Sequence, residues 1–552
     1  MKSLKSSDFK LLCTASFLQI IAMTPWVNSD SLIIPKLIIL FLTSLYILPK
    51  LIFHKKIFLE NLYLKAFMIL VIIIIIDLIL IVIISDAPYA QQFFGRTGRG
   101  LGFITETSIL LLVVGAAFFI SKSNVELLLY TLFISSLVTS AYSVLQRFGL
   151  DIFDWNTKTN GIIGTLGNPN FQSSFAAMAL IPTLVYFWNK KKGKLLSLIS
   201  IIPILTLIYL SQSVQGYILI SVGAFVFILT LTWYKYRFLF IPLFLVSFFS
   251  SITVFLGMIN KGPFSDLLYK PSVQSRGEFL RTGISITNDN PIFGVGLDSV
   301  GDYFLMYRSE KDAQGIGEFA DHLHNFFLQY SSVGGYPLAF LQLFLILLTL
   351  ASYFNVQKGI GQFNSKLTAL FCAWVCYLVQ SLISPQNISM MGLNALITGS
   401  LIGLTRIESN SGKSVLVVQN TNYKLTKPFS SLLLLIGAII VYPYFNVDRQ
   451  QLQSARTGNG NLAILSAKSF PESTVRYSRI GEELLKSNLG AQALEIARSA
   501  VDFNPHAPSA WGLLLVNNFA SYEERTKAQQ ELIKLDPNNI EIRNFIIPKS
   551  IS

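Results

Sequence analysis

The chain has 552 residues, of which 52% are hydrophobic and only 13% are charged, and its mean hydropathy is +0.54. So much apolar surface cannot be buried in a water-soluble core, so the composition excludes an ordinary soluble enzyme and indicates a membrane protein. The net charge of +13 would suggest nucleic acid as a partner of a soluble protein. Here the lysines and arginines cluster at the ends of apolar runs, so we ascribe the charge to membrane topology and expect no nucleic-acid partner.

The N-terminal segment places Lys2, Lys5 and Lys10 before an apolar run from Leu11 to Val27. This order is shared with signal peptides, but no small-residue cleavage site follows and another apolar run begins at once. We therefore expect a retained first helix.

Several later runs exceed the roughly 18 apolar residues needed to cross about 30 Å of hydrocarbon. The clearest are Leu62 to Ile84, Phe103 to Ile120 and Phe238 to Met258. Backbone groups in lipid must hydrogen-bond within their own segment, so these runs predict helices. The expected fold is all-α, a polytopic bundle of about 12–13 transmembrane helices over residues 1–445.

Asp77 lies in the middle of one of these runs. An ionisable group at this depth is costly, and it usually faces protein or water. We expect a structural hydrogen bond inside the bundle more than a functional role.

The basic residues between the runs indicate one orientation. If the N-terminus is cytoplasmic, the short cytoplasmic loops hold most of the lysines, as the positive-inside rule requires. These basic residues are Lys50, Lys55, Lys56, Lys122, Lys190, Lys191, Lys192, Lys194, Lys235, Arg237, Lys358, Lys366, Arg406, Lys413, Lys424 and Lys427. The last span, Pro428 to Phe445, then places residues 446–552 on the extracytoplasmic side of a bacterial inner membrane.

Four segments fall on the extracytoplasmic face: Asp86 to Gly102, Leu150 to Asn170, a turn at Ser211 to Gly216, and a long loop over residues 259–324.

These segments carry arginines on the face where the charge rule disfavours them. They are Arg96, Arg99, Arg276, Arg281 and Arg308. Either they bind an anionic ligand, or they form ordinary loop ion pairs with carboxylates. The candidate carboxylates are Asp86, Asp266, Glu278 and Asp302. The glycine-rich stretch from Gly95 to Gly102 also permits tight turns whose backbone amides could form an anion nest.

The long loop closes with Asp-His-Leu-His-Asn, which contains two of the four histidines in the chain, His322 and His324. Their i, i+2 spacing is poor for a metal site on one helix face, so we expect no metal and no cofactor. Beside cationic arginines, His324 is well placed to take a proton from an acceptor hydroxyl. A purely structural role for this histidine stays open.

The tail differs in composition from the rest of the chain, and prolines mark a period in it. Pro471, Pro505 and Pro537 are separated by about 34 and 32 residues, close to the tetratricopeptide period. Residues 446–552 thus predict a helical-repeat domain. Two or three such units are few for independent stability, so we expect the tail to pack on the membrane part or on a protein partner.

Four segments resemble, in this order, the O-antigen polymerase and ligase superfamily, which includes protein O-oligosaccharyltransferases. They are F-F-G-R-T-G-R-G-L-G (Phe93 to Gly102); Leu145-Gln146 through G-T-L-G-N-P-N-F (Gly164 to Phe171); S-R-G-E-F-L-R followed by N-P-I-F-G-V-G; and H-N-F-F-L-Q with Gly334 and Gly335 a short distance on. The combination is specific although each piece is not. The C-terminal repeats are similar to those appended in some members.

The resemblance implies a glycosyltransferase of cell-surface polysaccharide assembly. It would transfer a glycan from an undecaprenyl diphosphate carrier to a glycan, lipid or protein acceptor, outside the inner membrane and without a metal. The essential arginine and histidine of the family carry over onto Arg276 and His324, which we predict to be catalytic. As substrate-binding residues we predict Arg281, Arg99, Arg96 and His322.

One position departs from the family pattern. Many members have an arginine after the serine of a short S-R-x-G turn, where this chain has Val214 within S-V-Q-G. Either one diphosphate contact is missing here, or the turn is aligned wrongly.

Two other classes of function stay open. A transporter or flippase of lipid-linked glycans would also need basic grooves, although no inverted repeat is visible in the sequence. A membrane scaffold would act through the repeat domain and its protein partners. The metal-using transferases of polyprenyl phosphate sugars are disfavoured, because Asn28 to Ser31 in the first outer loop contain no Asp-x-Asp or similar carboxylate cluster.

Overall fold

The computed structural model describes residues 2–53, 61–153, 155, 162–188, 190, 193–258, 260–268, 271–314, 319–409 and 423–548. Five lysines that we assigned to cytoplasmic loops, Lys55, Lys56, Lys191, Lys192 and Lys413, lie outside these ranges. Within them all regular structure is helical, which confirms the predicted all-α class.

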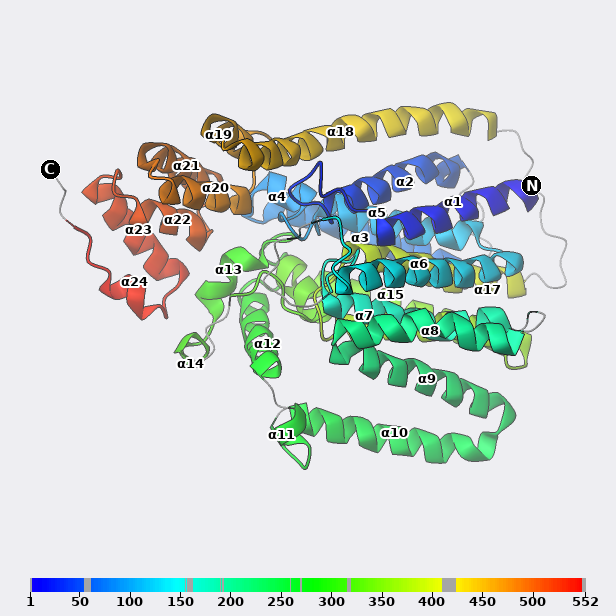
Figure 1. The fold of residues 1–552 in the computed structure, drawn as a ribbon. Coiled ribbons are helices and arrows are strands. Elements are labelled where there is room, and N and C mark those ends of the chain that lie inside the picture. The colour runs from blue at the N-terminus through cyan, green and yellow to red at the C-terminus, as the bar shows by residue number, and fades with distance from the viewer. Residues whose placement is uncertain are drawn as a thin grey trace.

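Thirteen long helices of the described part run side by side as one bundle (Figure 1). They are α1 (Lys2–Ile21), α2 (Ile34–Phe53), α3 (Leu62–Ile84), α5 (Phe103–Phe119), α6 (Val125–Arg147), α7 (Pro169–Trp188), α8 (Gly193–Ser211), α9 (Val214–Lys235), α10 (Arg237–Met258), α15 (Phe326–Ile360), α16 (Ser365–Ser381), α17 (Ile388–Ser409) and α18 (Tyr423–Thr457). Nine of them are long and apolar enough to cross a membrane, and α5 and α10 contain shorter apolar helices. The polytopic membrane bundle is thereby confirmed, and α1 and α16 pack within it.

Helix α17 forms the centre of the bundle, because almost its whole span is buried. It packs closely on α5 through Gly399 and Gly403, which are four residues apart on one face. A Cβ atom at these positions would lie 2.1 Å from the Val113 carbonyl oxygen and 2.3 Å from that of Ala117. Small residues at this spacing let two helix backbones approach, which is how helices associate in lipid.

Helix α3 lies at the edge of the bundle, and one side of it is exposed. Asp77 is half-buried on this helix, and it has no hydrogen-bond partner among the described residues. The structural hydrogen bond that we expected for Asp77 is therefore absent from this part of the chain.

The predicted long loop between α10 and α15 is largely helical. It contains α11 (Ser265–Leu268), α12 (Pro271–Asp289), α13 (Val300–Tyr307) and α14 (Glu310–Gln314). With α4 (Tyr89–Phe94), these helices gather at one end of the bundle (Figure 1). We call this end the polar cap.

A break in α15 fastens the loop to the bundle. Gly335 has φ +70°, which interrupts the helix after Gly334. At this break the Val295 amide donates to the Ser332 carbonyl at 2.8 Å, and the Tyr336 amide donates to the Pro291 carbonyl at 2.8 Å. The N-P-I-F-G-V-G motif and the glycine pair are thus two halves of one contact.

Helix α18 continues from the membrane part into the tail, so the predicted boundary between residues 445 and 446 falls within a continuous helix. The tail then contains α19 (Gly460–Lys468), α20 (Thr474–Lys486), α21 (Gly490–Phe503), α22 (Pro508–Val516), α23 (Tyr522–Leu535) and α24 (Ile540–Asn544). Neighbouring helices pack in pairs, notably α20 with α21 and α22 with α23. The tetratricopeptide interpretation of these pairs stays a prediction.

The tail packs on the polar cap, as we expected from its small size. Arg308 donates to both carboxylate oxygens of Asp536 at 3.0 Å, and Asn538 donates to the Arg308 carbonyl at 2.8 Å. Asn504 donates to Asp302 at 3.0 Å in a buried contact. These hydrogen bonds tie the tail to α13 and to the residue that follows it.

Replacing Gly335 by alanine tests the break in α15. A Cβ atom there would lie 2.4 Å from the Ile292 carbonyl carbon, and the clash adds to a backbone strain of about 1–3 kcal/mol, because φ +70° with ψ −177° is adopted almost only by glycine. Gly361→Ala is the matched control, because Gly361 has φ +71° but open space around it. We expect Gly335→Ala to lower the melting temperature in detergent far more than Gly361→Ala does. Equal shifts would show that the break does not fasten the loop.

Candidate active site at the polar cap

The glycine-rich turn that follows α4 does form a nest of backbone amides. The amides of Arg96 and Leu101 both donate to Asp298 Oδ2, at 2.7 and 2.9 Å. Gly95 allows this turn to close, because glycine adopts a φ of +90° without steric strain. The anion in the nest is thus the carboxylate of Asp298, and these two amides are not available to a ligand.

Arg96 and Arg99, which flank this turn, are each held by an aspartate. Arg96 donates to Asp302 at 2.7 Å, and both groups are buried. Arg99 binds Asp321 with two hydrogen bonds, of 3.0 Å from Nε and 2.7 Å from Nη2. Burial opposes ionisation of Asp321, but the Arg99 guanidinium prevails and lowers the pKa of this aspartate to about 2.

Arg281 and Arg308 are also in ion pairs. Arg281 forms two hydrogen bonds with the buried Asp312, and Arg308 binds Asp536 of the tail. Four of the five arginines are therefore paired, and Asp302, the partner of Arg96, is one of the carboxylates that we named.

Arg276 differs from the other four arginines, because it makes no ion pair or hydrogen bond with any residue in the described ranges. It lies half-buried on α12, and burial lowers the pKa of its guanidinium. Phe279 is one helical turn further on and stacks on the His324 ring, with centroids 5.0 Å apart. Residues three apart share a helix face, so Arg276 is on the side of α12 that faces His324.

His324 is held in a defined orientation by its own backbone and by His322. Its φ of +56° is uncommon for a residue other than glycine. Its Nδ1 lies 2.9 Å from the His322 carbonyl oxygen, which can only accept, so Nδ1 carries the proton. The lone pair is then on Nε2, which has no hydrogen-bond partner in the described part of the chain.

The His324 imidazole is neutral at physiological pH. Burial lowers its pKa to about 4, and the positive charges of Arg99 and Arg276 act in the same direction. A neutral ring with a lone pair on Nε2 can accept a proton.

His322 is completely buried, so its ring does not face the solvent. Its Nδ1 lies 3.0 Å from the His324 amide and its Nε2 lies 3.3 Å from the Gln386 amide. A neutral imidazole has only one lone-pair nitrogen, so it accepts from one of these amides at a time. Either contact fixes the backbone that carries His324.

The segment that contains α12 and the two histidines matches a known protein family. Residues 198–343 match the family described as O-antigen ligase. The chain carries an O-antigen ligase family domain. Members of this family are enzymes that transfer glycans, and the match includes Arg276, His322 and His324 but not the glycine-rich turn or the tail. No curated protein matches the sequence.

A polar cavity of about 200 Å³ lies next to the matched segment and is lined by residues outside the match. Asp30, Arg99 and Asn168 line it, together with Gln386, whose amide faces His322. Two of the motifs that carried the resemblance, the glycine-rich turn and G-T-L-G-N-P-N-F, thus meet at one cavity beside the histidines.

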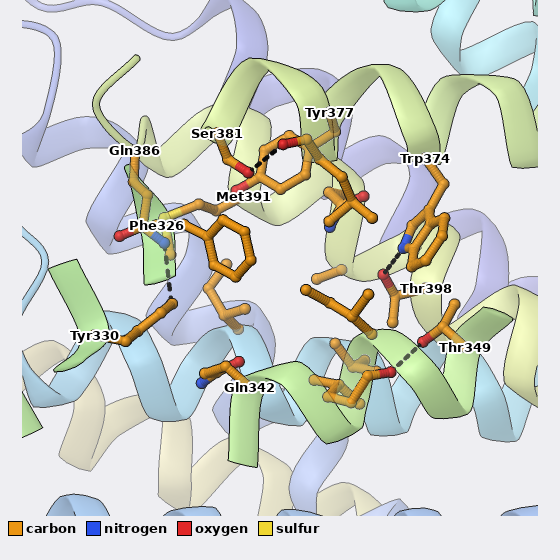
Figure 2. A pocket seen from close by; sticks show the side chains of 17 residues that line it. Phe326, Tyr330, Gln342, Thr349, Trp374, Tyr377, Ser381, Gln386, Met391 and Thr398 are labelled. Atoms are coloured by element: carbon orange, nitrogen blue, oxygen red, sulfur yellow. Dashed lines mark hydrogen bonds between the residues drawn. The ribbon is translucent and has the colours of Figure 1, made fainter. Parts of the chain in front are cut away.

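A second, smaller cavity of about 90 Å³ lies inside the bundle, directly behind the histidine segment. Figure 2 shows its mostly apolar wall, with Phe326 beside Gln386 and with Gln386 hydrogen-bonded to Tyr330. Its walls are mostly apolar and its volume is small, so we assign no substrate to it.

The turn with Val214 lies beside the polar segments of the cap. Ser213 donates to Asn170 at 2.7 Å, and the Val214 side chain is 64% exposed. The turn is therefore close to the G-T-L-G-N-P-N-F segment, but Val214 supplies no charge to it.

Replacing Arg276 by glutamine tests whether this cation acts on His324. The change removes a positive charge that disfavours the imidazolium, so the pKa of His324 should rise above about 4. NMR of ring-labelled histidine can measure this pKa, because the chain has only four histidines. Arg281→Gln on the same helix is the control and should leave the pKa unchanged. If the pKa of His324 is unchanged in Arg276→Gln, the charge of Arg276 does not act on His324.

Proposed function

We propose that this protein transfers a glycan from an undecaprenyl diphosphate carrier to an acceptor hydroxyl, with Arg276 and His324 as the catalytic residues. One observation carries the proposal: the guanidinium without a partner in the described ranges lies beside a neutral histidine whose Nε2 is free. The O-antigen ligase match over residues 198–343 supports a lipid-linked glycan as the donor.

The reaction breaks the bond between the anomeric carbon of the glycan and the diphosphate oxygen, and forms a bond from that carbon to the acceptor oxygen. The leaving diphosphate takes the electron pair and gains negative charge. Arg276 binds its oxygens, because a planar guanidinium can form two parallel hydrogen bonds with phosphate and stays charged. A guanidinium stabilises this leaving group without help from a metal.

His324 accepts the proton of the attacking hydroxyl on Nε2. A histidine with a pKa near 4 is a weak base, but the diphosphate changes its surroundings. Donor bound at Arg276 offsets a positive charge that disfavours the imidazolium, so the pKa of His324 rises when the donor is present. Binding of the donor therefore makes His324 a stronger base for the acceptor hydroxyl.

The other predicted site residues act around this pair. Arg99 lines the polar cavity while it holds Asp321, so we assign it to the saccharide side of the substrate. Arg96 and Arg281 hold the frame through their aspartates, and His322 positions His324.

We place the polar cap and the tail on the extracytoplasmic side, because the positive-inside count puts the opposite ends of the helices in the cytoplasm. A phosphatase fused after Ser552 should then be active, and a fluorescent reporter that folds only in the cytoplasm should stay dark there. The reverse pattern would overturn the topology and the side on which the reaction occurs.

Two substitutions test the roles by separating donor binding from transfer. Arg276→Lys keeps a charge but loses the bidentate geometry, so donor binding should weaken and transfer should fall by at least about tenfold. His324→Ala should bind donor normally but lose transfer on the order of a hundredfold or more. Binding and transfer of an undecaprenyl diphosphate glycan are measured in detergent with a chelator present.

Gln530→Trp replaces an exposed residue in α23 of the tail. It is the control for activity lost during preparation of a variant protein. Normal transfer by Arg276→Lys or His324→Ala would refute the mechanism, as would loss of wild-type activity on chelation. Donor binding that is lost only in His324→Ala would mean that the two roles are exchanged.

A further inference from the structure

A cleft of about 700 Å³ separates the tail helices from α13 of the polar cap. This volume is in the range of about 300–1,000 Å³ that is typical of ligand sites. Helices α20, α22, α23 and α24 form the tail side, and the cap side is formed by α13, Arg96 and Phe319. The tail helices and α13 lie next to each other in Figure 1.

The walls of the cleft are apolar over most of their surface but also carry charged groups. Leu305, Phe319, Val516 and Ile542 line it, and Phe319 and Val516 are 53% and 50% exposed. Ser478 and Ser509 add hydroxyl groups to the tail side, and Arg479, Glu482 and Glu541 add charges of both signs there. The other charged groups of the lining, Arg96, Asp302 and Asp536, are already in ion pairs. Large apolar side chains left open to water in a concave surface mark a binding site.

Gly512 gives a second, independent indication of a ligand. It lies in the middle of α22 and lines the cleft, and no atom is within 4 Å of a Cβ placed there. Glycine inside a helix costs about 1 kcal/mol relative to alanine, and no packing contact in the described structure requires it here. A glycine facing a cleft allows another chain to approach the helix backbone closely.

The cleft lies next to the segment that carries the histidines. Gly301 of α13 lines the cleft, and a Cβ atom on it would lie 3.1 Å from the Cα of Asp321. Asp321 precedes His322 and binds Arg99. A chain lying in the cleft is thus separated from the histidine segment by one layer of residues.

We propose that this cleft binds an extended polypeptide, and that the acceptor of the transferred glycan is therefore a hydroxyl group on a protein. The inference rests on the proposed function and names its acceptor. Apolar side chains of a peptide fit walls of leucine, phenylalanine, valine and isoleucine. The Ser478 hydroxyl donates to Ser509 at 2.9 Å, so the Ser509 hydroxyl keeps its own proton for a backbone carbonyl of the peptide. Charged side chains of a peptide can pair with Arg479, Glu482 and Glu541.

The test fills the cleft without disturbing the fold. Gly512→Trp introduces a large side chain into open space and raises helix propensity, so the tail should stay folded. Val516→Glu is a second variant, which places a charge on the exposed apolar wall. Gln530→Trp adds the same bulk to the face of α23 opposite the cleft residue Leu532 and serves as the matched control.

Binding is measured on the full-length protein with a pool of short random peptides that contain serine or threonine, by cross-linking from p-benzoylphenylalanine at position 542. Transfer is measured separately, with an undecaprenyl diphosphate glycan as donor and either the peptide pool or a core lipopolysaccharide as acceptor. We expect Gly512→Trp and Val516→Glu to lower peptide cross-linking and peptide glycosylation by at least about tenfold. Gln530→Trp should leave both unchanged.

Three outcomes separate this inference from the proposed function. Peptide binding and glycosylation that both depend on Gly512 and Val516 support it. Transfer to lipopolysaccharide alone, unaffected by Gly512→Trp, overturns the inference but leaves glycan transfer intact, and so does cross-linking of a saccharide or lipid in place of the peptides. Peptide binding without transfer to any acceptor would instead count against the proposed function.

Discussion

The ion pair between Arg99 and Asp321 connects the two polar segments from which the site is built. Arg99 comes from the glycine-rich turn, and Asp321 begins the segment that carries both histidines. Both groups are largely removed from water, so loss of either partner would leave a charge that is costly to bury. The pair therefore fixes the cavity beside Arg99 and the backbone of His324 together. Because Arg96 and Asp302 extend the same network to Asn504, the position of the tail depends on it as well.

The same rule supports our proposal that Arg276 binds the substrate directly, while the other four arginines are held by aspartates. A guanidinium at a membrane surface is stable when an aspartate neutralises it, as Asp312 does for Arg281. Arg276 lacks such a partner in the described ranges, and burial disfavours its charged form. A phosphate group would supply the missing negative charge, so the unpaired cation is already arranged for its ligand.

The sequence was a good guide to the helices and a poor guide to the contacts between them. Hydropathy predicts the bundle because each span is a local property of about twenty residues. The partners of the arginines are not local: Arg99 and Asp321 are 222 residues apart in the chain, and Arg308 and Asp536 are 228 apart. The order of motifs also suggested that Gly334 and Gly335 matter, but only the structure shows that they break α15 to receive the loop.

The reactivity of His324 follows from constraints that act together. A left-handed backbone and the His322 carbonyl fix the ring and place its lone pair on Nε2, while burial, together with Arg99 and Arg276, lowers its pKa and keeps it neutral. The burial and the cations that keep this histidine neutral also keep it weakly basic, so in the proposed mechanism it activates water poorly in the absence of donor. In the same mechanism, a bound diphosphate offsets the charge of Arg276 and raises the basicity of the ring next to the bond that is to be broken. A transferase that must use a chosen hydroxyl in preference to water benefits from a base whose strength depends on the presence of the donor.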